Sequence, residues 1–435
     1  MMKILFRTFL VCLCLSKLYA QEGLPVNLQQ VLELAGANNL TIKALVTQQK
    51  ISQARLKEAN EWWYPTLYLG ANTNQLWGTS MNADGTFNTD VSSDNLWLGM
   101  GVSVTLNFAD GIYKTKAAQR RMQASEHLTQ AQKNQMLLQC IYAYYDLLNE
   151  QMKIRAFADL VAQSETITHQ IAVQVEAGLR YESELQLAKS NLAHYKLEAM
   201  NATKAYRLKS IQLARLLNLR QDVMLVSSEA AITPIEFKTA QSLESDRSEI
   251  KAVQSSIQAL QEEKKSVTTG HYMPQLQING YGSEFGSLSG DIDSRQALAD
   301  TQQLYPTTGA NVGLVWKVPL GRIFSQGEKE RYDATIKAQY LQKEDLEAQI
   351  QEEIKSALAE LQIGKEQIIF AKQALQTTTK ALNQSIERQK LGTAKPFEVF
   401  QVQAYYLQAK IDYFKTISEY NKAQFSLKVA KGEVL

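Results

Sequence analysis

Residues 95–108 read NLWLGMGVSVTLNF, and every second residue in this stretch is apolar. The apolar set is Leu96, Leu98, Met100, Val102, Val104, Leu106 and Phe108, and the residues between them are mostly small or polar. A strict period of two indicates a strand with one apolar face and one polar face. The run is long for a strand of a globular protein and suits a tilted membrane strand, which needs about 9–11 residues.

A second stretch with the same alternation lies about 210 positions further along the chain. Residues 308–321 read TGANVGLVWKVPLG, with apolar side chains recurring at every second position from Ala310 to Val318. Two shorter segments, which begin at Pro65 and Pro274, alternate in a similar way. The sequence therefore predicts four two-faced strands arranged as a duplication. We expect the apolar face to meet lipid, at Leu98, Met100, Val102, Val104, Val312, Leu314 and Trp316.

Small and polar residues separate the two strands of each predicted pair. They fill residues 78–94 in the first pair and residues 283–307 in the second. Outer-membrane barrels combine short periplasmic turns with longer extracellular loops. We therefore expect both stretches to be long loops on the outer side of a membrane.

The N-terminal residues 1–20 combine basic Lys3 and Arg7 with an apolar run and end on the small residue Ala20. This pattern predicts a secretory signal peptide that is cleaved after Ala20. A membrane anchor is the weaker interpretation because the apolar run is too short to span a bilayer. Beyond residue 20 the sequence has no apolar run of the length that a transmembrane helix needs, so strands must provide any membrane span.

Charge and cysteine content exclude several classes of function. The chain has 46 basic and 44 acidic side chains, and Lys3, Arg7 and Lys17 lie in the signal peptide. The mature chain is therefore close to neutral, which gives no indication of nucleic acid as a partner. Cys140 is the one cysteine after the signal peptide, so no internal disulfide is possible, and we expect it in the core. The sequence shows no catalytic triad, phosphate loop or metal-ligand pattern, so we expect neither an enzyme nor a cofactor.

Apolar residues at helical spacing fill most of the remaining chain. Residues 28–63 predict a first helix, which Trp62, Trp63 and Tyr64 close in front of Pro65. These aromatic residues fit a girdle at a membrane interface or a hydrophobic cluster at a domain seam. Residues 110–177 predict a helix about 100 Å long, and residues 181–217 predict a helix that returns beside it.

The second half repeats this plan, with predicted helices at residues 243–267, from Ser325 to Leu391, and from Pro396 to about residue 431. Ser325 can cap its helix, and a proline is tolerated in the first turn of the last one. We therefore divide the chain into the signal peptide (1–20), a first structural repeat (21–217), a connecting segment (218–245) and a second structural repeat (246–435).

The strand number predicts self-assembly. Four strands cannot close a barrel, since the smallest closed membrane barrels have about eight, and their unpaired edges cannot face lipid. Three chains would together supply twelve strands and a bundle of long helices.

With these features the chain resembles the TolC-like outer-membrane efflux protein family over nearly all of its mature length. The motifs that carry the resemblance are YPTLYLGAN (64–72), LNFADGIYKTKAAQ (106–119), AGLRYESELQLAKSNLAHYK (177–196), MPQLQINGYG (273–282), VPLGRIFSQGEKERYDA (318–334) and LGTAKPFEVFQVQAYYLQAKIDYF (391–414). The resemblance implies an α+β membrane protein that is internally duplicated. Its long coiled-coil-like helices form a periplasmic helical barrel, and four strands per chain contribute to a 12-stranded trimeric β-barrel.

The resemblance also implies a function. Such a homotrimer sits in the outer membrane of a Gram-negative bacterium, among its lipids, with a large periplasmic extension. It is the exit duct of a tripartite efflux system for small molecules, and its partners are a periplasmic adaptor protein and an inner-membrane transporter. The outer-membrane channel of a type I protein secretion system is the alternative, and the sequence does not choose between the two. A secreted coiled-coil scaffold would explain the helices but not the strands.

The resemblance places functional residues at the helix tips. It implies adaptor docking at the turns that contain Gly178, Leu179, Gly392 and Thr393. It also implies a periplasmic gate lined by acids, whose positions fall on Glu398, Gln401 and Glu184. Because Gln401 departs from the family's acidic pattern, we expect one ring of three Glu398 carboxylates. Solvated acids at helix starts, favoured by the helix dipole, are the other interpretation of Glu398 and Glu184.

Overall fold

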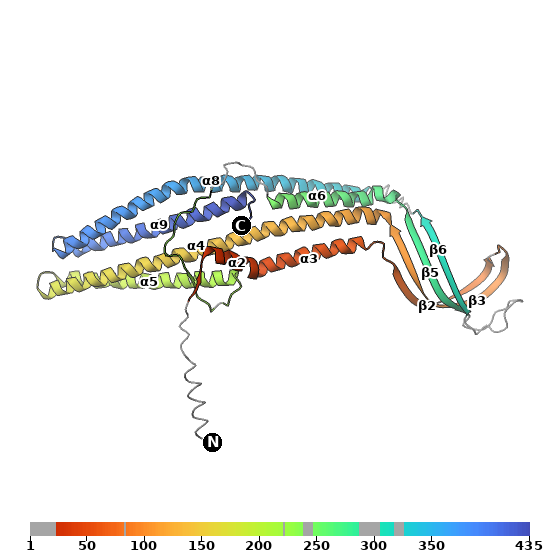
Figure 1. The fold of residues 1–435 in the computed structure, drawn as a ribbon, viewed down its shortest axis with the longest axis horizontal. Coiled ribbons are helices and arrows are strands. Elements are labelled where there is room, and N and C mark those ends of the chain that lie inside the picture. Colours follow the sequence, from red (N-terminus) through yellow and green to blue (C-terminus); the bar gives the residue numbers. More distant parts are fainter. Residues whose placement is uncertain (1–22, 82–83, 221, 238–246, 287–304, 317–325) are drawn as a thin grey trace, which may run out of the picture. The chain divides into compact units, whose positions relative to one another are not determined.

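The structure is a computed structural model that describes residues 23–81, 84–220, 222–237, 247–286, 305–316 and 326–435 (Figure 1). Its contacts divide the chain into two compact units. The first unit is Met1–Thr47, His127–Ile250 and Asp345–Leu435, and the second is Gln48–Glu126 and Lys251–Glu344. The predicted signal peptide and the predicted helix cap Ser325 lie outside the described residues.

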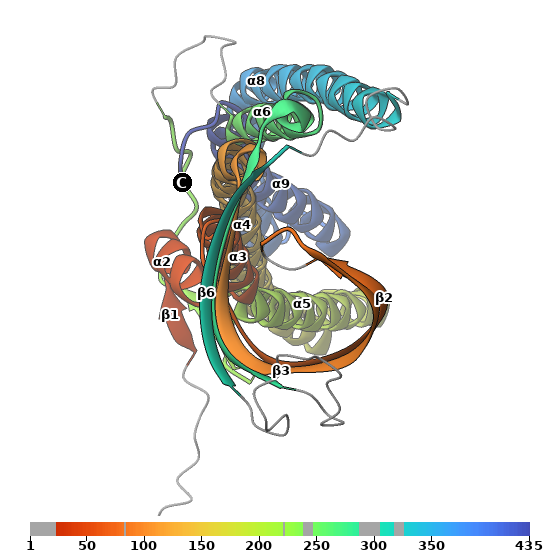
Figure 2. The same cartoon turned by 90° about the vertical axis from the view of Figure 1, so that its right-hand side faces the viewer.

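The second unit contains, among the described residues, one antiparallel sheet of four strands in the order β2-β3-β5-β6. The strands are β2 (Thr66–Met81), β3 (Phe87–Asn107), β5 (Gln275–Gly286) and β6 (Tyr305–Val315). Figure 2 shows them curved into an arc. The two predicted strand pairs therefore join through β3 and β5, and β2 and β6 form the two edges of the sheet.

The register of the sheet gathers the apolar side chains of all four strands on one face. Directly opposed residues of antiparallel strands point to the same side, so their side chains form rows across the sheet. The apolar pairs are Leu67–Val102, Leu69–Met100, Val104–Ile278, Ile278–Val312, Leu106–Leu276 and Leu276–Leu314. Most of these side chains are exposed, including Leu67, Leu69, Met100, Val312 and Leu314. A slip of one residue would move a whole strand's apolar set to the other face, so this agreement fixes the register.

The first hairpin is longer than expected, and the prediction of a loop over residues 78–94 is wrong. β2 continues to Met81 and β3 begins at Phe87, with a register shift between Gly78 and Ser80. In the turn, the Asp84 carboxylate accepts hydrogen bonds from the N–H of Thr86 at 3.0 Å and from its hydroxyl at 2.7 Å. Apolar and polar residues alternate only in a strand that has one apolar face and one polar face. A pair of strands with polar residues on both faces therefore has no alternating pattern that could predict it. Residues 287–304 of the second expected loop lie outside the described residues.

Strands and helices of the second unit meet through close contacts around Trp62. The helix α3 (Leu40–Asn60) precedes β2, whereas β3 leads into a π-helical turn, η1 (Asp110–Lys114), and then into α4 (Thr115–Glu176). The Trp62 ring leaves no room for a side chain at Gly111, where a Cβ would lie 2.4 Å from the ring. The same ring meets Phe108 edge-on, with 6.0 Å between ring centroids. The second strand pair joins α6 (Ser248–Val267) through a short turn, η2 (Thr269–Tyr272).

The first unit is built from two helical hairpins (Figure 1). In one, α4 turns into α5 (Glu182–Leu216), and in the other α8 (Gly327–Lys390) turns into α9 (Pro396–Ala430). Their shared core contains fully buried side chains from α4, α5 and α9, among them Ile141, Tyr144, Leu147, Leu148, Leu213 and Ile417. Cys140 is fully buried in this core, as predicted, and burial raises the pKa of its thiol to about 11. Two short strands, β1 (Leu24–Val26) and β4 (Leu225–Ser227), pair in parallel.

The first predicted helix is in fact two helices, α2 (Leu28–Asn38) and α3, and the break lies at Asn39. The backbone of Asn39 leaves the helical region, with ψ of 125°. Its side-chain oxygen accepts the N–H of Ile42 at 3.1 Å, and its amide donates to the carbonyl of Leu216 at 2.6 Å. One asparagine therefore caps α3 and satisfies a carbonyl at the end of α5.

Asp146 of α4 links the two repeats through two lysines. Its carboxylate accepts a hydrogen bond from Lys209 of α5, with 2.8 Å between Nζ and Oδ2, and another from Lys422 of α9. Burial alone would raise the pKa of Asp146, but these hydrogen bonds and the two lysine charges outweigh it and hold the pKa below its usual value. The cluster therefore stabilises the fold while the carboxylate is ionised.

Asp146→Asn should lower the free energy of unfolding near neutral pH by about 1–3 kcal/mol, since hydrogen bonds between charged groups contribute about that much. Because the folded-state pKa is depressed, this contribution is complete above the unfolded-state pKa of about 3.9 and is lost as pH falls through the lower folded value. Thermal unfolding followed by circular dichroism in detergent should separate the two proteins at neutral pH and bring them together in strong acid. Asp159→Asn is the control, since Asp159 pairs with Lys410 at 2.9 Å from an exposed position and should show a smaller difference. A difference that persisted in acid would instead mean that the amide disturbs packing.

The α+β, internally duplicated fold is confirmed, because a strand pair, a long helix and a returning helix follow one another in each half. No helix in the described part of the chain is both long and apolar enough to cross a membrane. The 12-stranded trimeric barrel and the domain boundaries at residues 21–217, 218–245 and 246–435 stay predictions.

Candidate functional site

Both helical hairpins turn at a glycine in the left-handed backbone region, with φ of +72° at Gly178 and +74° at Gly392. In the first turn the N–H of Leu179 donates to the carbonyl of Gln174 at 2.8 Å. In the second turn the N–H of Thr393 donates to the carbonyl of Arg388 at 2.9 Å. These are the hydrogen bonds of a Schellman motif, which glycine allows without steric cost. The two predicted turns therefore have the same geometry.

The returning helices place the two predicted gate acids at equivalent positions. Glu184 lies in the first turn of α5 and Glu398 in the first turn of α9, where the helix dipole favours negative charge. Gln401 lies one turn further along α9 and is exposed. The structure therefore brings Glu184, Glu398 and Gln401 to the same end of the first unit as the two glycine turns.

Each of the two acids is paired with an arginine that the sequence analysis missed. Nη1 of Arg388 lies 2.5 Å from Oε1 of Glu398, and Nη1 of Arg180 lies 3.2 Å from Oε2 of Glu184. Arg180 lies in the turn just before α5 and only four residues from Glu184, so their closeness in the sequence could have revealed the first pair. The second pair crosses the turn between α8 and α9, and no local spacing indicates it.

Arg180 also joins the two turns to each other. Its side chain is only 10% exposed. Besides Glu184, it donates to Oε1 of Gln174 at 2.5 Å and to the carbonyl of Ala394, in the other turn, at 3.1 Å. Behind the turns, an apolar cluster packs α4 and α5 against α9. Its members are Ile167, Ile171, Leu185, Ala188, Val399 and Phe400.

The turns expose large apolar side chains. We call these residues the tip crown: Leu179, Tyr181, Leu391 and Phe397. The side chains of Leu179 and Leu391 are 77% and 76% exposed to solvent. Apolar groups gathered at a surface indicate an interaction site. The predicted docking residues Leu179 and Thr393 therefore lie within or beside the tip crown.

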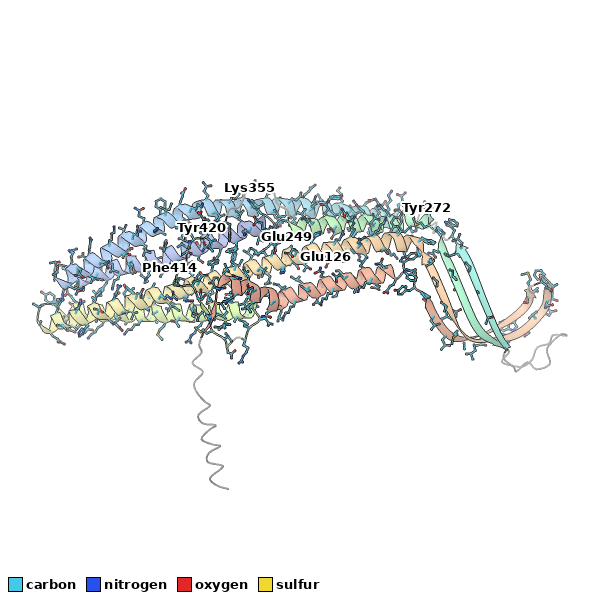
Figure 3. All side chains as sticks on the ribbon, viewed as in Figure 1. Glu126, Glu249, Tyr272, Lys355, Phe414 and Tyr420 are labelled. Atoms are coloured by element: carbon cyan, nitrogen blue, oxygen red, sulfur yellow. The ribbon has the colours of Figure 1, made fainter. Side chains whose placement is uncertain are left out.

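Exposed aromatic side chains mark the junction between helices and strands in the second unit. They include Trp63, Tyr64, Trp316, which follows the last residue of β6, and Tyr272, which Figure 3 labels. Nε1 of Trp316 donates to the carbonyl of Tyr272 at 3.1 Å. Aromatic residues with one polar atom are enriched at membrane interfaces. Their exposure favours the predicted aromatic girdle over a hydrophobic cluster at a domain seam. Trp62, in contrast, packs against Phe108 and Gly111.

The predicted lipid-facing residues share the apolar face of the sheet. Leu98, Met100, Val102, Val312 and Leu314 are exposed there, and Val104 is half-buried. The opposite face is polar, and the Ser103 hydroxyl donates to Oδ1 of Asn279 across β3 and β5 at 2.6 Å. Among the described residues, no group of His, Cys, Asp and Glu side chains is placed to hold a metal ion.

Comparisons with known proteins agree with this fold. Residues 31–219 match the family model described as outer membrane efflux protein. The outer-membrane channel OprN is 16% identical, with a TM-score of 0.73 over 96% of this chain and 94% of that one. The Campylobacter jejuni CmeC outer membrane channel is 17% identical, with a TM-score of 0.75 over 93% of this chain and 85% of that one. The open state of the Neisseria gonorrhoeae MtrE outer membrane channel is 15% identical, with a TM-score of 0.71 over 94% and 89%. No curated protein matches the sequence.

The structural neighbours establish the fold, and the family match covers most of the first predicted repeat. The three solved structures named above are outer-membrane channels, and they share this architecture. Over residues 31–219 the chain matches the outer membrane efflux protein family, which is the family that the sequence motifs predicted. Its localisation is therefore the outer membrane, with a periplasmic helical extension.

Proposed function

We propose that this protein is the exit duct of a tripartite efflux system, which passes small molecules across the periplasm and the outer membrane. In this function it works with a periplasmic adaptor protein and an inner-membrane transporter. The observation that carries the proposal is the exposed apolar face that the register builds across β2, β3, β5 and β6. Such a face costs free energy in water and is favoured against lipid.

The sheet also supports a homotrimer. β2 and β6 end it on both sides, and open strand edges are not stable in the hydrocarbon core of a membrane. A ring of three copies would join β6 of one chain to β2 of the next and close twelve strands. That number lies within the range of known outer-membrane barrels.

The hairpin turns are the part of the chain where we place the periplasmic gate and the docking surface for the adaptor. In a ring of three chains, Glu398, Gln401 and Glu184 would surround the axis and form the periplasmic gate. The tip crown, together with Gly178, Leu179, Gly392 and Thr393, would be the docking surface for the adaptor. Apolar side chains on two turns that Arg180 links suit a partner that offers an apolar groove or helical hairpin.

The first test concerns assembly. Detergent extracts that are not boiled should show a species of about three times the mass of the boiled monomer on electrophoresis, and it should be found in the outer-membrane fraction. Boiling should convert this species to monomer. A soluble periplasmic monomer would contradict the proposal.

The second test concerns cargo. Cells that lack the protein should accumulate a fluorescent small-molecule dye and become more sensitive to toxic compounds, and the intact chain should restore export. A double substitution in the tip crown, Leu179→Asp with Leu391→Asp, should fail to restore export although the trimer still forms. If dye export is unaffected but a secreted protein disappears from the medium, the type I secretion alternative replaces efflux.

A further inference from the structure

The geometry points to Arg388 and Arg180 as the residues that set the charge selectivity of the constriction. Each of them neutralises the acid that would otherwise line it. The inference rests on the proposed function, which places the first turns of α5 and α9 around the pore. A ring of free carboxylates attracts cations and repels anions, whereas a ring of ion pairs has little net charge and favours neither.

The pair in the second repeat is the closer of the two. Nη1 of Arg388 and Oε1 of Glu398 are 2.5 Å apart, so the positive charge is in direct contact with the carboxylate. The pair connects the last turn of α8 with the first turn of α9, so both charges lie at the hairpin turn itself. Their side chains are 54% and 40% exposed, which leaves both in contact with water. At this exposure the pair adds little to stability, and its main consequence is electrostatic.

In the first repeat the gate acid is also paired with an arginine, but the arginine lies at a different position relative to the acid. Arg180 precedes Glu184 by four residues, whereas Arg388 precedes Glu398 by ten. The duplication has therefore not kept one arginine position, yet each acid has an arginine partner. In the second turn, residues 387–398 carry Arg388, Lys390 and Lys395 against Glu387 and Glu398. The first turn, residues 174–184, carries Arg180 against Glu176, Glu182 and Glu184. The small excesses of the two turns have opposite sign, so neither turn supplies a ring of acids alone.

The expected effect on permeation is large enough to measure. A unit charge about 7 Å from an ion in water changes the local concentration of that ion by roughly threefold. Three copies act together in the proposed trimer, and salt screens part of their effect. Removal of one member of the Arg388–Glu398 pair from every copy should therefore change the permeability ratio of K⁺ to Cl⁻ by about tenfold.

The experiment measures reversal potentials in a KCl gradient for the full-length trimer in planar bilayers. We expect a permeability ratio near one for the wild type, a shift toward cations for Arg388→Gln, and a shift toward anions for Glu398→Gln. The double variant should return to the wild-type ratio. Glu165→Gln is the matched control, because Glu165 is an exposed acid that pairs with Lys196 at 2.7 Å at a distance from both turns, and it should leave the ratio unchanged. Trimer formation by every variant is checked on gels without boiling.

Strong cation preference of the wild type, unchanged in Arg388→Gln, would overturn the inference and restore a free carboxylate ring. If the wild type conducts but neither single variant shifts the reversal potential, the turns do not line the constriction. The inference then fails while the channel function stands. A wild-type protein that forms no pore at all would refute the proposed function and the inference together.

Discussion

Val102→Arg should remove most of the protein from the outer membrane, whereas Thr105→Arg should be tolerated. Val102 lies in the middle of the apolar run of β3 and pairs with Leu67 and Gly280 on the exposed apolar face. An arginine that faces lipid near the bilayer midplane costs about 2–4 kcal/mol, and a trimer would contain three of them. Thr105 belongs to the same strand and is also exposed, but it points to the polar face, where it pairs with Gln277. In a barrel this face lines the interior, which is polar.

The measurement is the amount of trimer in the outer-membrane fraction, compared among the wild type, Val102→Arg and Thr105→Arg at equal expression. We expect Val102→Arg to accumulate as degraded or aggregated monomer and Thr105→Arg to insert. Equal losses from both substitutions would show that the assignment of the two faces is wrong. Normal insertion of Val102→Arg would show that this part of β3 does not meet lipid.

The second large effect is expected at Arg180. Its nearly buried guanidinium donates to Gln174, Glu184 and the carbonyl of Ala394, and only the last of these bonds connects the two hairpin turns. A hydrogen bond of a charged group contributes about 1.5–3 kcal/mol, so Arg180→Ala removes a contact of this size between the two turns. We therefore expect the turns to separate and the single-channel conductance to rise.

Spin labels at Leu179 and Leu391 would report the separation, because both side chains are exposed and lie in different turns. In double electron–electron resonance, Arg180→Ala should broaden the distance distribution and shift it to longer values. Lys196→Ala serves as the control, since it removes an exposed ion pair with Glu165 between α4 and α5 and should leave the distribution as it is. Identical distributions for Arg180→Ala and the control would mean that the apolar cluster behind the turns, and not Arg180, holds them together.

The long elements could be predicted because each carries its own signal. The strand around Val102 alternates because one side of it is apolar and the other polar. The helix α4 contains no glycine or proline before Gly178, and α8 has only the isolated Gly364 in its interior before Gly392. Glycine at positions 178 and 392 is required by the left-handed turn, so the turns could be located to the residue. Because the chain is internally duplicated, each of these sequence patterns occurs twice.

The features that the sequence analysis missed depend on contacts between distant residues. The break at Asn39 is not at a glycine or proline, since Gly36 lies inside α2, and the Asn39 amide instead reaches the end of α5. The extension of the first hairpin has polar residues on both faces, so alternation could not reveal it. The pairing of Glu398 with Arg388 requires the packing of α8 on α9, so neither the net charge nor the spacing of charged residues predicts it.

The short parallel pair of β1 and β4 has a consequence for the order of folding. The hairpins α4–α5 and α8–α9 close through neighbouring residues at their turns, but Val26 of β1 meets Ser228, just after β4, across 202 positions of the chain. Contacts across long loops form late because the entropy of the open loop must first be lost. We expect β1 to stay undocked until α4 and α5 have paired, and the edges of the sheet to stay open until other copies arrive. During that interval the open edges of β2 and β6 invite aggregation, so a periplasmic chaperone that covers strand edges should determine the yield of this protein.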